Sequence, residues 1–138
     1  MKQATANSTS TAGIAIAKPT RVLLVEDHLA ILELYREGLE LAGLEVQTAG
    51  DGVEALTLLK NAQPRPEVIV TDIEMPRLDG LELARHATQL FPDIKVIFIS
   101  GASEHPVTEG HPFFIKPFPI RDLVQCIHDL VRDSKSNA

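Results

Sequence analysis

The sequence predicts an α/β fold, with one parallel sheet that is covered by helices on both faces. Two short apolar runs, 22–25 and 68–70, consist of Val, Leu and Ile without polar alternation, which is typical of strands buried on both faces. Segments with helical periodicity alternate with such runs, and this alternation favours parallel pairing through helical crossovers. The chain contains no internal repeat.

Five strands are predicted. Each combines β-branched, aliphatic or aromatic side chains with a flanking Gly, Pro or Asp that signals a turn. In chain order, the predicted strands cover residues 21–25, 45–49, 68–71, 95–100 and 113–115.

Four helices are predicted between and after these strands. In chain order, they cover about residues 28–42, 51–59, 79–90 and 120–132. Gly43 suits a left-handed cap after the first helix, and Asp51 and Asp79 suit N-terminal caps of the second and third. The side chains predicted to face the sheet are Ile31, Leu34, Tyr35 and Leu39 in the first helix, and Leu123, Val124, Ile127 and Val131 in the last.

No full helix is expected between the fourth and fifth strands. Residues 101–112 contain two Pro and two Gly and almost no apolar side chains. We therefore predict that residues 102–112 form a loop or a single turn.

Composition limits the classes of function. The 138 residues suit one domain over residues 20–132, with flexible tails at 1–19 and 133–138. The net charge of −6 and the lack of a basic run argue against a direct nucleic-acid partner. A single cysteine, Cys126, excludes an intrachain disulfide. No segment has the pattern of a membrane span or a signal peptide, so a cytoplasmic location without a membrane partner is expected.

Three carboxylates follow two of the buried strands. Glu26 and Asp27 come directly after 21–25, and Asp72 comes directly after 68–71. Because parallel strands end at the same edge of a sheet, we expect these carboxylates to share one crevice. Two such charges 4 Å apart repel by about 4 kcal/mol at an effective dielectric of 20, so a cation is expected, and oxygen ligands suit Mg²⁺ or Mn²⁺. The alternative for Glu26 and Asp27 is a helix cap.

Two more polar residues end predicted strands. Lys116 follows the fifth strand, and Ser100 ends the fourth. An ammonium group and a hydroxyl at this edge can both contact a phosphoryl oxygen. The alternatives are a solvated surface lysine and a turn serine.

Taken in order, these residues resemble the response-regulator receiver domain of two-component signalling. The resemblance rests on Glu26-Asp27, on Asp72 in Asp-Ile-Glu-Met-Pro-Arg-Leu-Asp-Gly, on Ser100 and on Lys116-Pro117-Phe118, and it covers about residues 20–132. It implies a flavodoxin-like, doubly wound sheet of five parallel strands in the order 2-1-3-4-5. The helix between strands 4 and 5 would be short or absent.

The resemblance also implies a phosphoacceptor and a metal site. Asp72 would take a phosphoryl group from a phosphohistidine on a sensor histidine kinase or a histidine phosphotransfer protein. Asp27 and Asp72 would bind Mg²⁺ directly, Glu26 mostly through water, and Glu74 through its backbone carbonyl. The chain would be no enzyme in the usual sense, because it would promote only its own phosphorylation and dephosphorylation.

Three other roles follow from the same resemblance. Lys116 would contact the phosphoryl group, and its peptide bond to Pro117 would be cis. Ser100 would move toward the phosphoryl group, and Phe113 would follow it as an aromatic switch. The result would be a change in partner interactions.

The segment 102–112 departs from the usual receiver, in which a helix there contributes to the output and dimer face. The oligomeric state is therefore left open. Shortened receivers of this kind resemble those appended to hybrid sensor kinases, so a role in a phosphorelay or as a phosphoryl sink is expected. The domain would either stand alone or belong to a hybrid kinase. A DNA-binding output domain after residue 132 is therefore not expected.

Two alternative functions remain open. Glu26, Asp72 and Glu74 also fit the Toprim pattern of Mg²⁺-dependent nucleic-acid enzymes. A pseudo-receiver, which would bind partners without being phosphorylated, is the second alternative.

Overall fold

A computed structural model describes residues 18–101 and 108–136 and contains a sheet of five parallel strands. The strands are β1 (Arg21–Val25), β2 (Glu45–Ala49), β3 (Val68–Asp72), β4 (Lys95–Ser100) and β5 (Phe113–Ile115). Their spatial order, β2-β1-β3-β4-β5, confirms the predicted flavodoxin-like topology. Strand β3 is one residue longer than predicted, so Asp72 itself pairs in register with Ile99 of β4.

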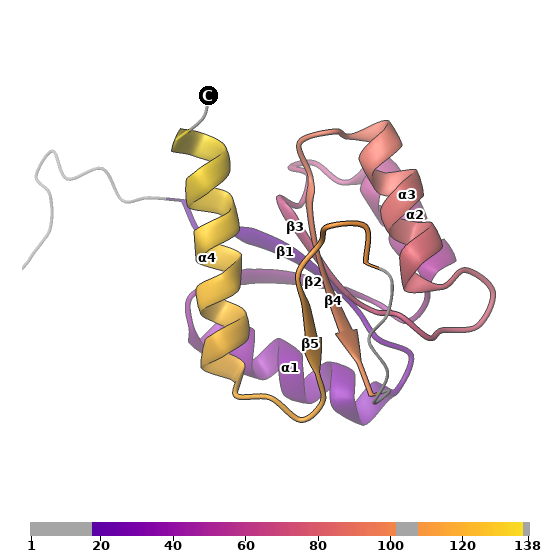
Figure 1. Ribbon diagram of the computed structural model, residues 1–138, viewed down its shortest axis with the longest axis horizontal. Coiled ribbons are helices and arrows are strands. Elements are labelled where there is room, and N and C mark those ends of the chain that lie inside the picture. Colours follow the sequence, from indigo (N-terminus) through magenta and orange to yellow (C-terminus); the bar gives the residue numbers. More distant parts are fainter. Residues whose placement is uncertain (1–17, 102–107, 137–138) are drawn as a thin grey trace, which may run out of the picture.

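Helices cover both faces of this sheet. They are α1 (Leu29–Leu41), α2 (Gly52–Asn61), α3 (Gly80–Leu90) and α4 (Ile120–Ser136). Helices α1 and α4 lie on one side of the sheet, and α2 and α3 lie on the other (Figure 1). Among the described helices, none is both long and apolar enough to cross a membrane.

The core consists of two apolar layers, one on each face of the sheet. In β1, Leu23 packs in the layer under α2 and α3, whereas Leu24 packs in the layer under α1 and α4. Both side chains are completely buried, as a strand in the middle of a parallel sheet requires. The apolar runs of the sequence therefore hold the carboxyl ends of β1 and β3 in fixed positions.

Two helix starts follow the sequence pattern closely. The Asp51 carboxylate accepts a hydrogen bond from the backbone N–H of Glu54 at 2.8 Å. The Asp79 carboxylate accepts one from the Glu82 N–H at 2.8 Å, and the Glu82 side chain accepts one from the Asp79 N–H at 3.3 Å. This second arrangement is a complete capping box, and it fixes the start of α3.

The predicted inner face of α1 is wrong at one position. Leu34 is 65% exposed, and Leu32 and Leu39 are the buried leucines of this helix. The helix carries apolar residues on more than one side, so a spacing of three and four residues fits two faces equally well. The packing against the sheet decides between them, and the sequence spacing does not.

Helix α4 is longer than predicted. It continues to Ser136, although residues 133–138 were expected to form a tail. No Gly or Pro interrupts the polar sequence after Arg132, so nothing there stops the helix. The predicted N-terminal tail falls almost wholly on residues 1–17, which lie outside the described residues, as do residues 137 and 138.

The connection between β4 and β5 is described only in its second half. Residues 108–112 contain no helix and form a tight turn at Glu109 and Gly110, where the φ angles are 54° and 88°. The His111 ring packs edge-on against Phe98 of β4, with ring centroids 5.6 Å apart. The remainder of the predicted loop, residues 102–107, lies outside the described residues.

Candidate functional site

The predicted carboxylates lie together at the carboxyl ends of β1 and β3. One carboxylate oxygen from each of Glu26, Asp27 and Asp72 lies within 4.8 Å of the others. Glu26 is only 3% exposed, and its backbone N–H donates to the Ala49 carbonyl of β2 at 3.1 Å. Asp27 is exposed, so the cluster has an open side.

Hydrogen bonds with neighbouring residues fix the position of Asp72. The Ile73 N–H donates to Asp72 Oδ1 at 3.0 Å, and the Thr71 hydroxyl donates to the Asp72 carbonyl oxygen at 2.8 Å. The N–H of Gly80, the first residue of α3, donates to the Ile73 carbonyl at 2.8 Å. A Cβ atom at Gly80 would overlap the Asp72 carbonyl oxygen, so only glycine permits this close approach of α3 to the end of β3.

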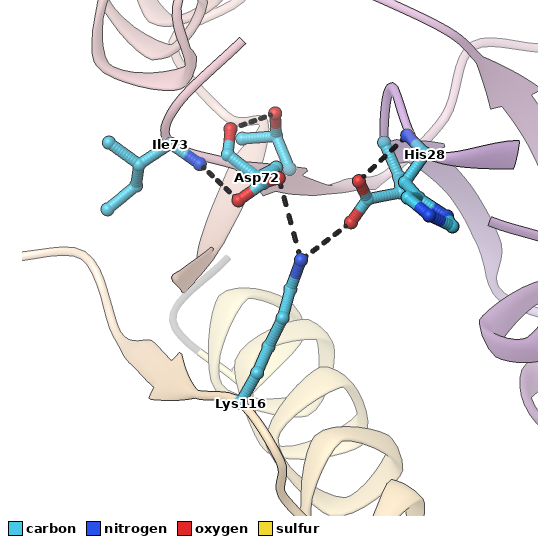
Figure 2. A network of polar contacts seen from close by, with 6 residues as sticks. His28, Asp72, Ile73 and Lys116 are labelled. Atoms are coloured by element: carbon cyan, nitrogen blue, oxygen red, sulfur yellow. Dashed lines mark hydrogen bonds and ion pairs between the residues drawn. The ribbon is translucent and has the colours of Figure 1, made fainter. Parts of the chain in front are cut away.

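Lys116 reaches the carboxylates from the end of β5. Its Nζ lies 2.8 Å from Glu26 Oε1 and 3.5 Å from Asp72 Oδ2. Figure 2 shows the extended Lys116 side chain pointing toward Asp72, with the dashed lines of both contacts meeting at the ammonium nitrogen. The other Glu26 oxygen accepts a hydrogen bond from the His28 N–H at 3.0 Å.

The backbone places Lys116 next to the end of β4. The Lys116 N–H donates to the Ser100 carbonyl at 2.8 Å. The Lys116–Pro117 peptide bond is cis, as the resemblance implied. A second cis bond, Gln63–Pro64, has no counterpart in the sequence-based predictions.

The electrostatics of the crevice favour an added cation. Burial, and then the negative charge of Glu26, raise the pKa of Asp72 to about 6, although Lys116 acts in the opposite direction. Burial lowers the pKa of Lys116, but the hydrogen bond to Glu26 and the charges of Asp72 and Glu26 outweigh it, and the net shift is upward. Three carboxylates and one ammonium leave a formal charge of −2.

This set of donors fits a divalent metal ion with oxygen ligands. Glu26, Asp27 and Asp72 offer carboxylate oxygens only, and Asp27 opens to solvent, where bound waters can complete an octahedron. Among the described residues, no thiolate or imidazole belongs to the cluster, so the donor set suits Mg²⁺ or Mn²⁺ better than zinc or copper.

The other predicted residues lie at or near the same edge. Ser100 is buried at the carboxyl end of β4, and Glu74 is exposed in the loop that follows β3. Phe113 pairs with Phe98 in the sheet and packs in the layer of α2 and α3, whereas Phe114 packs in the opposite layer. These adjacent phenylalanines therefore face opposite sides of the sheet.

Two aromatic residues beside Lys116 were given no functional role from the sequence. The sequence places Phe118 in the Lys116-Pro117-Phe118 motif and predicts Tyr35 as a core residue of the first helix. In the fold, their rings stack with centroids 5.5 Å apart. Because Tyr35 and Phe118 come from distant parts of the chain, no local pattern signals this contact.

Comparisons with known proteins agree with the fold. The family model of the response regulator receiver domain matches residues 22–128. The response regulator MprA of Mycobacterium sp. (strain KMS) is 34% identical over 122 residues, which cover 83% of this chain and 51% of MprA. The sensor kinase CckA of Brucella abortus (strain 2308) is 34% identical over 116 residues, which cover 80% of this chain and 12% of the kinase.

A solved structure shows the same architecture. The crystal structure of the response regulator TrrA from Thermotoga maritima, in complex with Mg²⁺-BeF, superposes with a TM-score of 0.73 at 30% identity and covers 80% of this chain and 98% of that one. The present chain spans about half the length of the MprA response regulators that it matches. The family match favours a receiver over a Toprim-like enzyme. The chain belongs to the response regulator receiver domains of two-component signalling.

Proposed function

We propose that this receiver is a phosphoacceptor in which Asp72 takes a phosphoryl group from a phosphohistidine. The donor would be a sensor histidine kinase or a histidine phosphotransfer protein. The observation that carries the proposal is the placement of Asp72 Oδ2 3.5 Å from the ammonium group of Lys116, within an acidic crevice that fits a divalent cation. A pseudo-receiver would have no need of this combination.

The two oxygens of Asp72 are suited to different tasks. Oδ1 is held by the Ile73 N–H, while Oδ2 faces Lys116 and is the oxygen proposed to attack phosphorus. As the O–P bond forms, the P–N bond of the donor breaks, and the imidazole nitrogen keeps the electron pair. Attack by water on the phosphorus later restores the carboxylate and releases inorganic phosphate.

Charge neutralisation is the main catalytic requirement of this transfer. Lys116 is proposed to contact the phosphoryl oxygens. Asp27 and Asp72 are proposed to hold Mg²⁺ directly, with Glu26 acting mainly through water and Glu74 through its backbone carbonyl. Bound Mg²⁺ supplies positive charge next to the phosphoryl oxygens, and Mn²⁺ can replace it. The Mg²⁺-BeF complex of TrrA supports this proposal by similarity.

Ser100 and Phe113 are proposed to carry the conformational response. A phosphoryl group adds negative charge and new acceptor oxygens close to the end of β4. The Ser100 hydroxyl would donate to one of these oxygens, and Phe113, which pairs with Phe98 of the same strand, would change its packing. The altered surface would change affinity for partner proteins.

The proposed partners are proteins rather than nucleic acid or membrane. The net charge of −6 disfavours direct binding to phosphate backbones. Similarity to the CckA sensor kinase supports a role in a phosphorelay, whereas similarity to MprA supports a separate response regulator. A cytoplasmic location remains part of the proposal.

The proposal is tested by incubating the protein with a small acyl phosphate and Mg²⁺ and then measuring its intact mass. Wild type should gain one phosphoryl group, and a chelator should prevent the gain. Asp72→Asn should gain none, whereas Asp93→Asn, which changes an exposed acid before β4, should react like wild type. Absence of phosphate on wild type would overturn the proposal and favour a pseudo-receiver. Equal phosphate on Asp72→Asn would overturn the assignment of Asp72 as the phosphoacceptor.

A further inference from the structure

Three aromatic rings pack together beside the turn that carries Lys116. Phe118 lies between the rings of Tyr35 and Phe114, with centroid distances of 5.5 Å and 5.2 Å. The Tyr35 and Phe118 planes differ by 28°, which is a stacked arrangement. Aromatic pairs at such distances stabilise a structure beyond the area that they bury.

Two of these rings lie close to Lys116 in the sequence, so their packing constrains the position of the lysine. Phe114 comes two residues before Lys116 and Phe118 comes two residues after it, so their contact closes a short loop around the lysine. Tyr35 belongs to α1, the helix that follows Glu26 and Asp27. The stack therefore ties the Lys116 turn to the helix that starts at the acidic crevice.

The ring of Tyr35, rather than its hydroxyl, contacts Phe118. Within residues 18–101 and 108–136, the Tyr35 hydroxyl makes no hydrogen bond. The ring is half-buried. Burial raises the pKa of the Tyr35 hydroxyl, and the charges of Lys116, Glu26 and Asp72 also act on it. A phenylalanine at this position would keep the stacking.

We propose that Tyr35 is a positioning residue for phosphoryl transfer, because its ring, stacked on Phe118, holds the Lys116 ammonium between Glu26 and Asp72. The proposal rests on the proposed phosphoacceptor function. Tyr35 touches no reacting atom. Its effect passes through Phe118 and the backbone of the turn, and it should appear in the rate of transfer more than in metal affinity, since Tyr35 offers no ligand to the metal.

Two kinds of variant separate positioning from general packing. Tyr35→Phe keeps the ring, whereas Tyr35→Leu and Phe118→Leu each remove one side of the stack. Val131→Ala is the matched control, because it shortens a buried side chain in the same core layer without touching the stack. Thermal unfolding of each variant reports whether it is folded, and if Tyr35→Leu does not fold, Phe118→Leu tests the same contact.

The first measurement is the position of Lys116, determined from crystal structures of wild type and the variants without a phosphate donor. In wild type and Tyr35→Phe, Nζ should lie 2.8 Å from Glu26 Oε1. In the leucine variants, the ammonium should leave this position. An unmoved Lys116 in both leucine variants would overturn the proposal, and this result does not depend on whether the protein is phosphorylated.

The second measurement is the rate of phosphorylation by a small acyl phosphate at saturating Mg²⁺. Each leucine variant should be slower by about twofold to tenfold, the range that the loss of one aromatic pair allows. The double variant should be no slower than the slower single variant, and Tyr35→Phe and Val131→Ala should match wild type. Two results would contradict the positioning role of Tyr35. One is a wild-type rate in both leucine variants, and the other is a rate loss in the double variant that equals the product of the two single losses. Failure of wild type to react would instead contradict the phosphoacceptor function, and the crystal structures would still decide the role of Tyr35.

Discussion

The Nζ atom of Lys116 lies 2.8 Å from the Oε1 atom of Glu26, and this ion pair joins the end of the fifth strand to the end of the first. The Glu26 side chain is only 3% exposed and that of Lys116 is 20% exposed, so water screens the pair weakly. Asp72 shares the same ammonium group at 3.5 Å. The lysine therefore partly neutralises the acidic crevice and also competes with any cation that enters it.

The first prediction concerns this competition. Lys116→Ala should bind Mg²⁺ more tightly, on the order of tenfold, because the variant removes a positive charge that repels the metal ion. Its phosphorylation should nevertheless be slower, because the phosphoryl oxygens lose a cation. Calorimetric titration of metal-free protein measures the affinity. Lys95→Ala, at the opposite end of the sheet, is the control. Weaker Mg²⁺ binding by Lys116→Ala would contradict this role of the lysine.

The second prediction concerns pH. The pKa of Asp72 is raised from 3.8 to about 6, mainly by burial and by the charge of Glu26, so the folded state holds this proton more tightly than the unfolded state does. The stabilisation from this group is complete below about pH 4 and is lost as the pH rises through about 6. In metal-free protein at pH 7.5, Asp72→Asn should therefore unfold with a larger free energy than wild type, by about 1 to 3 kcal/mol.

Urea unfolding in the presence of a chelator measures this difference. The advantage of Asp72→Asn should shrink between pH 7.5 and pH 5, and added Mg²⁺ should stabilise wild type more than the variant. Equal stability at pH 7.5, or an advantage that grows as the pH falls, would show that the Asp72 carboxylate is not destabilised by its surroundings.

The third prediction concerns the contact between α3 and the end of β3. Gly80→Ala should lower the free energy of unfolding by about 1 to 3 kcal/mol, because the new methyl group overlaps the Asp72 carbonyl oxygen. Gly101→Ala is the matched control, since a Cβ atom there meets nothing within 4 Å. Urea unfolding compares the two variants. Equal stability of Gly80→Ala and Gly101→Ala would mean that α3 can move away from Asp72 without cost.

The sequence predicted the strands well because their signal is local. The run 68–70 is apolar at every position, and all of its side chains are buried. The spacing of apolar residues gave the wrong prediction for Leu34. Helix α1 has apolar residues on several sides, and only its packing against the sheet selects the buried face. The end of α4 was also missed, since polar residues continue a helix as readily as they form a tail.

The three carboxylates of the site could be predicted from the topology of the sheet. Glu26 and Asp27 follow β1, Asp72 ends β3, and parallel pairing brings these strand ends together. The stack of Tyr35 on Phe118 could not be predicted in this way, because it depends on how α1 crosses the turn after β5. A contact of this kind exists only in the folded chain.

The most direct test of the central claim is to locate the phosphoryl group. The protein is first treated with a small acyl phosphate donor and Mg²⁺. The aspartyl phosphate formed on the protein is then reduced with borohydride, which converts the phosphorylated aspartate to homoserine. Peptide mass spectrometry should find homoserine at position 72 in wild type and at no position in a sample treated without the donor. Homoserine at position 27 in place of position 72, or its absence from wild type altogether, would contradict the assignment of Asp72 as the phosphoacceptor.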